Sequence, residues 1–159
     1  MENDDFDFEK EYKDLEDKYD LPKFESLAED FDVEKIFEKE SSFILREIRK
    51  AMSEKLYSYS SLLENLINPN SIPIFILSAI RNLTTDDKAK IKEIYKKLSS
   101  KQIEIMKLDT IYREECEAKF IRETFKLWEK LKPEIYEIII KLEEKAGEES
   151  NSRERGYFG

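Results

Sequence analysis

Cationic side chains at helical spacing are the residues of this sequence whose chemistry is easiest to name, because Lys and Arg can contact phosphate groups. The segment 81–101 carries seven of them against three acidic residues. Some of these cationic side chains share one side of a predicted helix that begins at residue 86. Further cationic side chains lie on the outer side of another predicted helix, over 33–67. If the two sides adjoin, they form a basic face made of Arg46, Arg49, Lys50, Arg81, Lys90, Lys97 and Lys101. The alternative is a solvated surface whose charges are balanced by neighbouring acids.

Aromatic side chains at both ends of the chain are candidates for binding a partner protein. Near the N-terminus they alternate with acidic residues, which can steer a basic partner while the rings anchor it. Near the C-terminus, two large rings lie on what we expect to be a flexible tether. The predicted partner-binding residues are Phe6, Phe8, Tyr12, Tyr157 and Phe158. The alternatives are a solubilising N-terminal arm and an unstructured C-terminal end.

The residue types needed for most enzymatic and cofactor chemistry are scarce. The chain has no His, which excludes the commonest general base, Ser-His and Cys-His nucleophile pairs, and His-containing metal sites. Its three Gly are Gly147, Gly156 and Gly159, so no Gly-rich phosphate loop can precede residue 147. The single Cys116 excludes an internal disulfide and has no His to activate it. We expect no enzymatic activity, no cofactor and no metal site.

Net charge separates the first part of the chain from the rest. The whole sequence has a net charge of −9 and an isoelectric point near 4.8. Residues 1–40 contain 17 acidic and 6 basic side chains, a net charge of −11, so the excess negative charge is N-terminal. An acidic protein without aromatic base-stacking motifs is not favoured to bind nucleic acid. The apolar run 72–80 is too short to span a bilayer and no signal peptide is visible, so we expect a cytoplasmic protein without a membrane partner.

Apolar residues recur at intervals of three, four or seven positions, which is typical of helices that bury one side. The Asn-Pro-Asn-Ser run at 68–71 separates the first two such segments, and Thr84 with Asp87 has capping-box spacing before the third. The stripe of the last segment continues through Pro133, which predicts a kinked but uninterrupted helix. A break is expected near 113–118. The predicted main helices are 33–67, 72–83, 86–112 and 117–145, with an accessory helix over 22–31. Ser41-Ser42 is the one position where the first of these helices could break or bend.

These elements predict an all-α protein, a single-domain bundle of four to five main helices. Residues 1–20 form a partly ordered acidic aromatic arm, and residues 21–146 form the bundle. Residues 147–159 form a flexible tail, because Gly147 is expected to end the last helix. The negative arm is then free either to dock on the bundle or to reach a partner.

The function that fits best is a non-enzymatic interaction or regulatory module that binds another macromolecule, namely another protein, through its outer helix faces and aromatic ends. One alternative is a nucleic-acid-associated factor that uses the basic face of 81–101, masked by the acidic arm. A second alternative is an enzyme of carboxylate or metal type, which would require a buried acidic cluster. A homo-oligomer is compatible with the sequence, because apolar residues such as Phe75 and Ile139 can fill either the core or a subunit interface.

Overall fold

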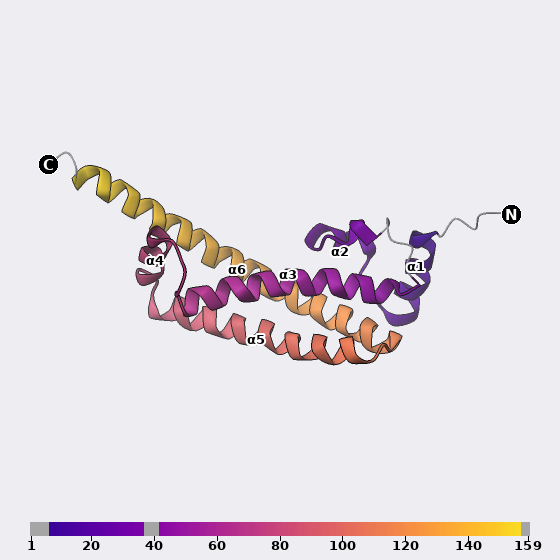
Figure 1. Ribbon diagram of the computed structural model, residues 1–159. Coiled ribbons are helices and arrows are strands. Elements are labelled where there is room, and N and C mark those ends of the chain that lie inside the picture. Colours follow the sequence, from indigo (N-terminus) through magenta and orange to yellow (C-terminus); the bar gives the residue numbers. More distant parts are fainter. Residues whose placement is uncertain (1–6, 37–41, 157–159) are drawn as a thin grey trace. The chain divides into compact units, whose positions relative to one another are not determined.

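The computed structural model describes residues 7–36 and 42–156, and every regular element in these ranges is a helix. The elements follow one another along the chain as Figure 1 colours them. They are α1 (Phe8–Tyr19), α2 (Phe24–Asp30), the 3-10 helix η1 (Val33–Ile36), α3 (Ile44–Ile67), α4 (Ile74–Arg81), α5 (Thr85–Thr110) and α6 (Glu114–Gly156). The predicted all-α class is confirmed. None of these helices combines the length and the apolar character that crossing a bilayer requires.

The chain divides into two compact units. Unit 1 takes its described residues from Met1–Tyr57 and Lys101–Trp128, and unit 2 from Ser58–Ser100 and Glu129–Gly159. The long helices α3, α5 and α6 contribute residues to both units.

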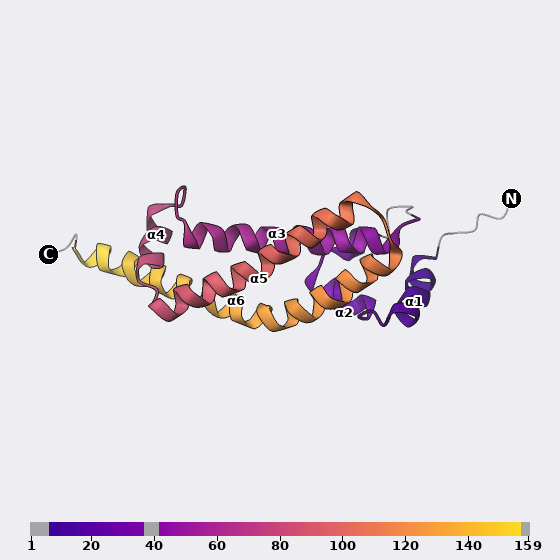
Figure 2. The same cartoon turned by 90° about the horizontal axis from the view of Figure 1, so that it is seen from below.

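The interior of unit 1 is built from apolar side chains of helices that are distant in sequence. Its buried residues include Leu27, Phe31, Val33, Ile48, Met52, Leu56, Phe120, Ile121 and Trp128. On α3 they recur every four residues, as the 3.6-residue helical period requires. The short connection at 111–113 reverses the chain direction between α5 and α6, as Figures 1 and 2 show. This connection lies at the N-terminal edge of the predicted 113–118 break.

Helix α1 packs on unit 1 through an aromatic cluster. The Phe24 ring lies edge-on to the rings of Phe8 and Tyr12, at centroid distances of 5.3 and 5.4 Å. The Tyr12 hydroxyl donates a hydrogen bond to the Pro22 carbonyl oxygen at 2.6 Å. Asp20 ends the helix in the left-handed region, with φ of 52°, where Asp is better tolerated than most residues. Residues 8–20 of the predicted arm are thus ordered by contacts with their own chain.

This packing corrects part of the partner-binding prediction. Phe8 and Tyr12 are buried in unit 1, so their rings are not presented to a partner. Exposing them would cost the free energy that burial of each ring contributes, about 2 to 3 kcal/mol. Phe6, Tyr157 and Phe158 lie outside the described residues.

Unit 2 is formed by α4 together with parts of α3, α5 and α6. Its buried apolar residues include Leu63, Leu66, Ala79, Ile80, Leu83, Ile91, Ile94, Leu98, Leu131, Ile135 and Ile138. Helix α5 begins with the predicted capping box: the Asp87 amide donates to Thr84 Oγ1 at 3.1 Å, and the Thr84 amide donates to Asp87 Oδ2 at 3.2 Å. The prediction for the start of this helix is confirmed.

Two predicted helix boundaries are wrong, and one predicted continuation of a helix is confirmed. The predicted 33–67 helix is wrong in its first third, because η1 is a 3-10 helix, Ser42 and Phe43 are not helical, and α3 begins at Ile44. Serine hydroxyls compete for backbone hydrogen bonds, which disfavours a continuous helix there. The predicted end at Gly147 is also wrong, since α6 continues to Gly156. One Gly destabilises a helix by only about 1 kcal/mol relative to Ala, and neighbouring residues with high helix propensity can offset this loss. The predicted continuation through Pro133 is confirmed.

Candidate functional site

A buried ionic cluster joins three helices of unit 1. Arg49 of α3 donates from Nε to Glu117 Oε2 of α6 at 2.8 Å, and from Nη1 to Asp109 Oδ1 of α5 at 2.8 Å. A third, longer contact joins Nη2 to Glu117 Oε1 at 3.4 Å. The Arg49 side chain is 1% exposed and that of Glu117 is 0% exposed. The cluster therefore neutralises a charge that would otherwise be unpaired in the interior.

The prediction that Arg49 lies on the outer side of its helix is wrong. Arg49 follows buried Leu45 by four residues and precedes buried Met52 by three, so it lies on the inward side. Burial alone would lower the pKa of Arg49, but the hydrogen bonds that Arg49 donates to Glu117 and Asp109 outweigh burial, and the pKa is raised. The guanidinium stays charged, so Arg49 links α3 to α5 and α6 as a permanent cation.

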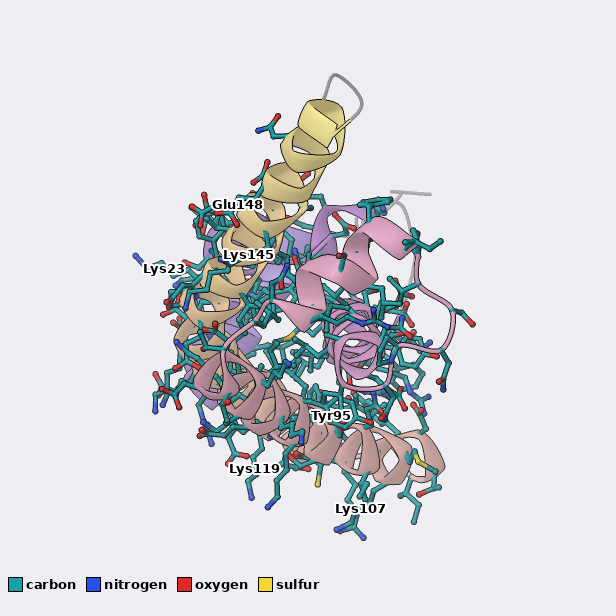
Figure 3. All side chains as sticks on the ribbon, turned by 90° about the vertical axis from the view of Figure 1, so that its left-hand side faces the viewer. Lys23, Tyr95, Lys107, Lys119, Lys145 and Glu148 are labelled. Atoms are coloured by element: carbon teal, nitrogen blue, oxygen red, sulfur yellow. The ribbon has the colours of Figure 1, made fainter. Side chains whose placement is uncertain are left out.

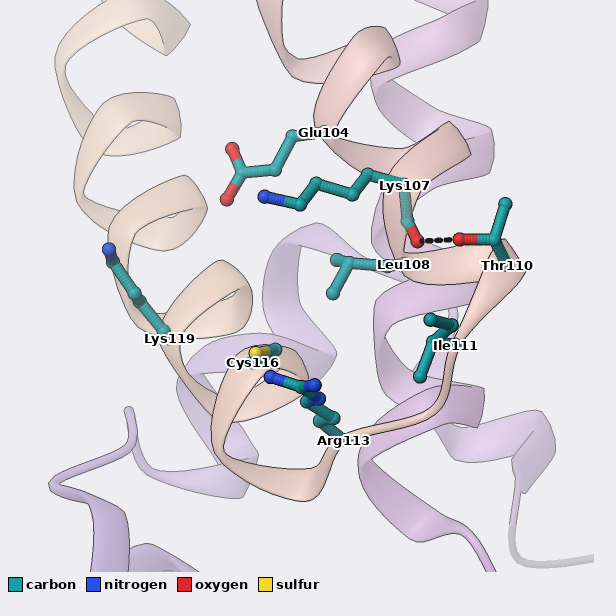
Figure 4. A pocket seen from close by; sticks show the side chains of 8 residues that line it. All are labelled: Glu104, Lys107, Leu108, Thr110, Ile111, Arg113, Cys116 and Lys119. Atoms are coloured by element: carbon teal, nitrogen blue, oxygen red, sulfur yellow. Dashed lines mark hydrogen bonds between the residues drawn. The ribbon is translucent and has the colours of Figure 1, made fainter.

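A pocket of about 400 Å³ lies beside the α5–α6 connection in unit 1. We call it the turn pocket, and it is lined by Glu104, Lys107, Leu108, Thr110, Ile111, Arg113, Cys116 and Lys119. Figure 4 shows Glu104 and Lys107 extending from α5 toward α6, while Arg113 and Cys116 lie where α6 begins. The Thr110 hydroxyl donates a hydrogen bond to the Lys107 carbonyl oxygen at 2.7 Å, so its proton is already used within α5.

The charges of the turn pocket are predominantly positive. Lys107 and Lys119 point away from the ribbons on the same side of the molecule in Figure 3. Three cationic side chains line the pocket against one carboxylate, Glu104, which already binds Lys101 at 2.8 Å. Within the described part of the chain, Lys107 and Arg113 form no ion pair.

A second hollow, of about 440 Å³, lies in unit 2 between the end of α3, α4 and the start of α5. We call it the α4 groove, and its lining residues are Leu66, Ile67, Pro69, Leu77, Ile80, Arg81, Lys88, Ile91 and Lys92. All the charged residues in this lining are cationic. Arg81, Lys88 and Lys92 form no ion pair with any residue whose side chain the structure describes. The groove therefore combines an apolar floor with an uncompensated positive rim.

The predicted basic face is not one set of equivalent side chains. Arg46, Arg49, Lys50 and Lys101 belong to unit 1, and Arg81, Lys90 and Lys97 belong to unit 2. Most of them have a partner in their own unit: Arg46 lies over the Tyr112 ring, and acidic side chains pair with Lys50, Lys90, Lys97 and Lys101. Among the seven, Arg81 is the one that lines the α4 groove.

The sequence interpretation missed the buried ionic cluster and did not select the other two rim residues. Glu117, Ile121, Thr124 and Trp128 have helical spacing and are all buried, so the spacing of Glu117 was a usable signal. Lys88 and Lys92 are four residues apart, which places both on one side of α5. Their proximity to Arg81 across a turn was not readable from spacing.

Acidic side chains of the described residues do not gather into a group of three or more that could hold a metal ion. Instead they pair with cations or hydroxyl groups. Hydrogen bonds from Lys141 and Thr84 lower the pKa of Asp87 to about 2. Hydrogen bonds from Tyr19 and Lys18 lower the pKa of Glu114. These carboxylates are stabilised as anions, which is the opposite of what a general acid requires.

The fold and these sites define an all-helical protein with two cation-rimmed hollows. No family model matches the chain, and no curated protein or solved structure is significantly similar to it. Function is therefore inferred from the residues and their geometry.

Proposed function

We propose that this protein is a non-enzymatic interaction module whose binding surface is the α4 groove, and whose partner is an acidic protein segment that carries apolar side chains. The observation that carries the proposal is the composition of the groove. Its nine lining residues include three cations and no carboxylate, in a chain whose net charge is −9.

The floor of the α4 groove can accept apolar side chains. Six of its lining residues are apolar, counting Pro69, and they come from two helices, the start of a third and the turn between α3 and α4. Ile74 lies three residues before Leu77 and seven before Arg81, so it extends the same side of α4. Its side chain is 72% exposed, and that of neighbouring Phe75 is 56% exposed. An apolar surface of this kind, rimmed by charge, is typical of helix-in-groove recognition.

The rim of the α4 groove favours acidic partners over basic ones. Lys90 and Lys97, on the same helix, are paired with Glu137 and Glu93 at 3.2 and 2.8 Å. The rim cations have no such pair in the described part of the chain. A partner carboxylate gains attraction there without displacing an existing ion pair, whereas a basic segment meets like charge.

Nucleic-acid binding remains the alternative, because the same three cations can contact phosphates. The floor distinguishes the two functions. Phosphate contacts need only the rim, but an acidic protein segment also buries apolar side chains against the floor. Binding of RNA or DNA would weaken steeply with salt, whereas floor contacts persist.

The test is a selection of peptides from a random displayed library against the full-length protein. We expect enrichment of sequences that combine acidic residues with apolar residues three or four positions apart. Binding of a selected synthetic peptide should weaken at least about tenfold when Ile80 is changed to Asp, with circular dichroism confirming the fold. Because Ile80 is buried, Ile74→Asp provides a second variant at an exposed position. A consensus without acids, or salt-sensitive binding of RNA or DNA that both variants retain, would refute the proposal.

A further inference from the structure

We propose that the turn pocket of unit 1 binds a small organic anion, a carboxylate attached to a short apolar body. This site is separate from the α4 groove and goes beyond the proposed interaction with a protein. Its volume of about 400 Å³ falls within the range of roughly 300 to 1,000 Å³ that small-molecule sites occupy.

The apolar part of the turn pocket is small. Leu108 and Ile111 are its two aliphatic side chains, whereas the α4 groove has five aliphatic side chains and a Pro. The methylene groups of Lys107 and Lys119 add further apolar surface beside them. The chain connection at 111–113 bounds the pocket at one end, as Figure 4 shows. A short acyl or aryl body fits such a floor better than a protein segment with several apolar side chains.

The charge of the turn pocket selects an anionic head group. Lys107 and Arg113 have no ion pair in the described part of the chain, and Lys119 has a single long contact of 3.9 Å with Glu123. The one lining carboxylate, Glu104, is within 2.8 Å of Lys101. A ligand carboxylate can therefore form charge-assisted hydrogen bonds with Lys107 and Arg113 without breaking a strong pair.

Cys116 makes occupancy of the turn pocket directly measurable. It is the only Cys in the chain, it is exposed, and it lines the pocket. A ligand in the pocket should shield its Sγ from a neutral thiol reagent such as N-ethylmaleimide. The rate of modification of the full-length protein then reports binding without any assumption about activity.

The experiment compares octanoate, octanol and octylamine as protecting ligands. We expect octanoate to slow modification of Cys116, and octanol and octylamine to need at least about tenfold higher concentrations for the same effect. Changing Lys107 and Arg113 together to Gln should weaken octanoate protection by about tenfold or more. Changing Lys10 and Lys126 to Gln, two exposed positions of unit 1 outside the pocket, should leave it unchanged.

The outcome does not depend on one variant. If the Lys107/Arg113 double variant has a lower melting temperature than the wild-type protein, Lys119→Gln replaces it. This variant should weaken the protection of Cys116 by octanoate several-fold. Absence of protection by octanoate, equal protection by octanol, or unchanged protection in the pocket variants would each overturn the proposal. Failure here leaves the α4 groove proposal intact, because no lining residue is shared by the two hollows.

Discussion

The two units differ in where their most informative charged residues lie: a deeply buried ion pair in unit 1 and a groove lined by cations without a carboxylate in unit 2. In unit 1, Arg49 and Glu117 are buried and bind each other at 2.8 Å. In unit 2, the ion pairs lie at the surface, such as Lys90 with Glu137, while the cations of the α4 groove have no pair in the described part of the chain. A charge inside a protein must be paired if the fold is to survive, whereas a charge on a rim is available for a partner.

This difference separates charged residues that stabilise the fold from charged residues that are available to a binding partner. Removing one member of a buried pair leaves an uncompensated charge in the interior, which is among the most costly single changes a protein can suffer. Exposed pairs are screened by water and salt and contribute little. Substitutions should therefore affect stability strongly in the ionic cluster of unit 1 and weakly on the surface of unit 2.

The largest effect is expected for Glu117→Ala. It removes two of the hydrogen bonds to Arg49 and leaves that guanidinium with Asp109 as its remaining partner in the cluster. We expect the free energy of unfolding in urea to fall by about 3 kcal/mol or more. The matched control replaces both charges, Arg49→Met with Glu117→Leu, and should lose clearly less. A loss below about 1 kcal/mol for Glu117→Ala would contradict the role of the cluster.

A smaller effect is expected for Tyr12→Phe, which removes the hydrogen bond to the Pro22 carbonyl oxygen. Unfolding should become easier by about 1 kcal/mol at pH 7. Burial raises the pKa of Tyr12, and Glu16 and Glu25 add to this. Since the folded state disfavours the phenolate, wild-type stability should fall as the pH rises above 10, the usual Tyr value, and Tyr12→Phe should fall less steeply. Parallel curves for the two proteins in alkaline urea titrations would exclude this account.

A still smaller effect is expected for Asp87→Asn in unit 2. Lys141 and Thr84 lower the pKa of Asp87 to about 2, so the stability that its anion contributes is complete above the usual value near 4 and is lost as the pH falls toward 2. At pH 7 the variant should lose about 0.5 to 1 kcal/mol, since the Asn side-chain oxygen can still accept the hydrogen bond from the Thr84 amide. The difference between the two proteins should disappear between pH 4 and pH 2. A gap that stays constant over this range would show that the ion pair is not its source.

The smallest effect is expected for Glu93→Gln. This side chain is 67% exposed, and it pairs with Lys97 one turn along α5. Water screens such a pair, so the urea midpoint of the variant should match that of the wild type within error. A measurable loss would mean that this exposed pair stabilises unit 2, contrary to the expectation from screening by water.

Local spacing was sufficient to predict most of the helices but not the contacts between them. The stripe through Ile48, Met52 and Leu56, and the capping box of Thr84 and Asp87, depend on residues close in sequence, and both were predicted. The pairing of Arg49 with Glu117 joins positions 68 residues apart, which no local pattern specifies. The α4 groove likewise depends on how the connections at 68–73 and 82–84 place the end of α3, α4 and the start of α5.

Candidate sites were harder to predict than helices because exposure depends on tertiary packing. Phe8 and Tyr12 have the spacing of a binding motif, and the same spacing allows their rings to pack against Phe24. The basic residues of segment 81–101 were predicted as a group, but among the described residues Lys90 and Lys97 have acidic partners and Lys88 does not. A count of charges along the chain cannot distinguish a paired Lys from a spare one.

We propose that the rim of the α4 groove supports binding and not folding. The most direct test is the affinity of a selected acidic peptide for a protein in which Arg81, Lys88 and Lys92 are all changed to Glu. Its control carries the same change in charge at exposed positions of unit 1, namely Lys10, Lys23 and Lys126. We predict that both proteins unfold at the wild-type urea midpoint and that only the rim variant loses affinity, by at least about tenfold. Equal loss of affinity in both, or a rim variant that binds normally or unfolds as readily as Glu117→Ala, would contradict the claim.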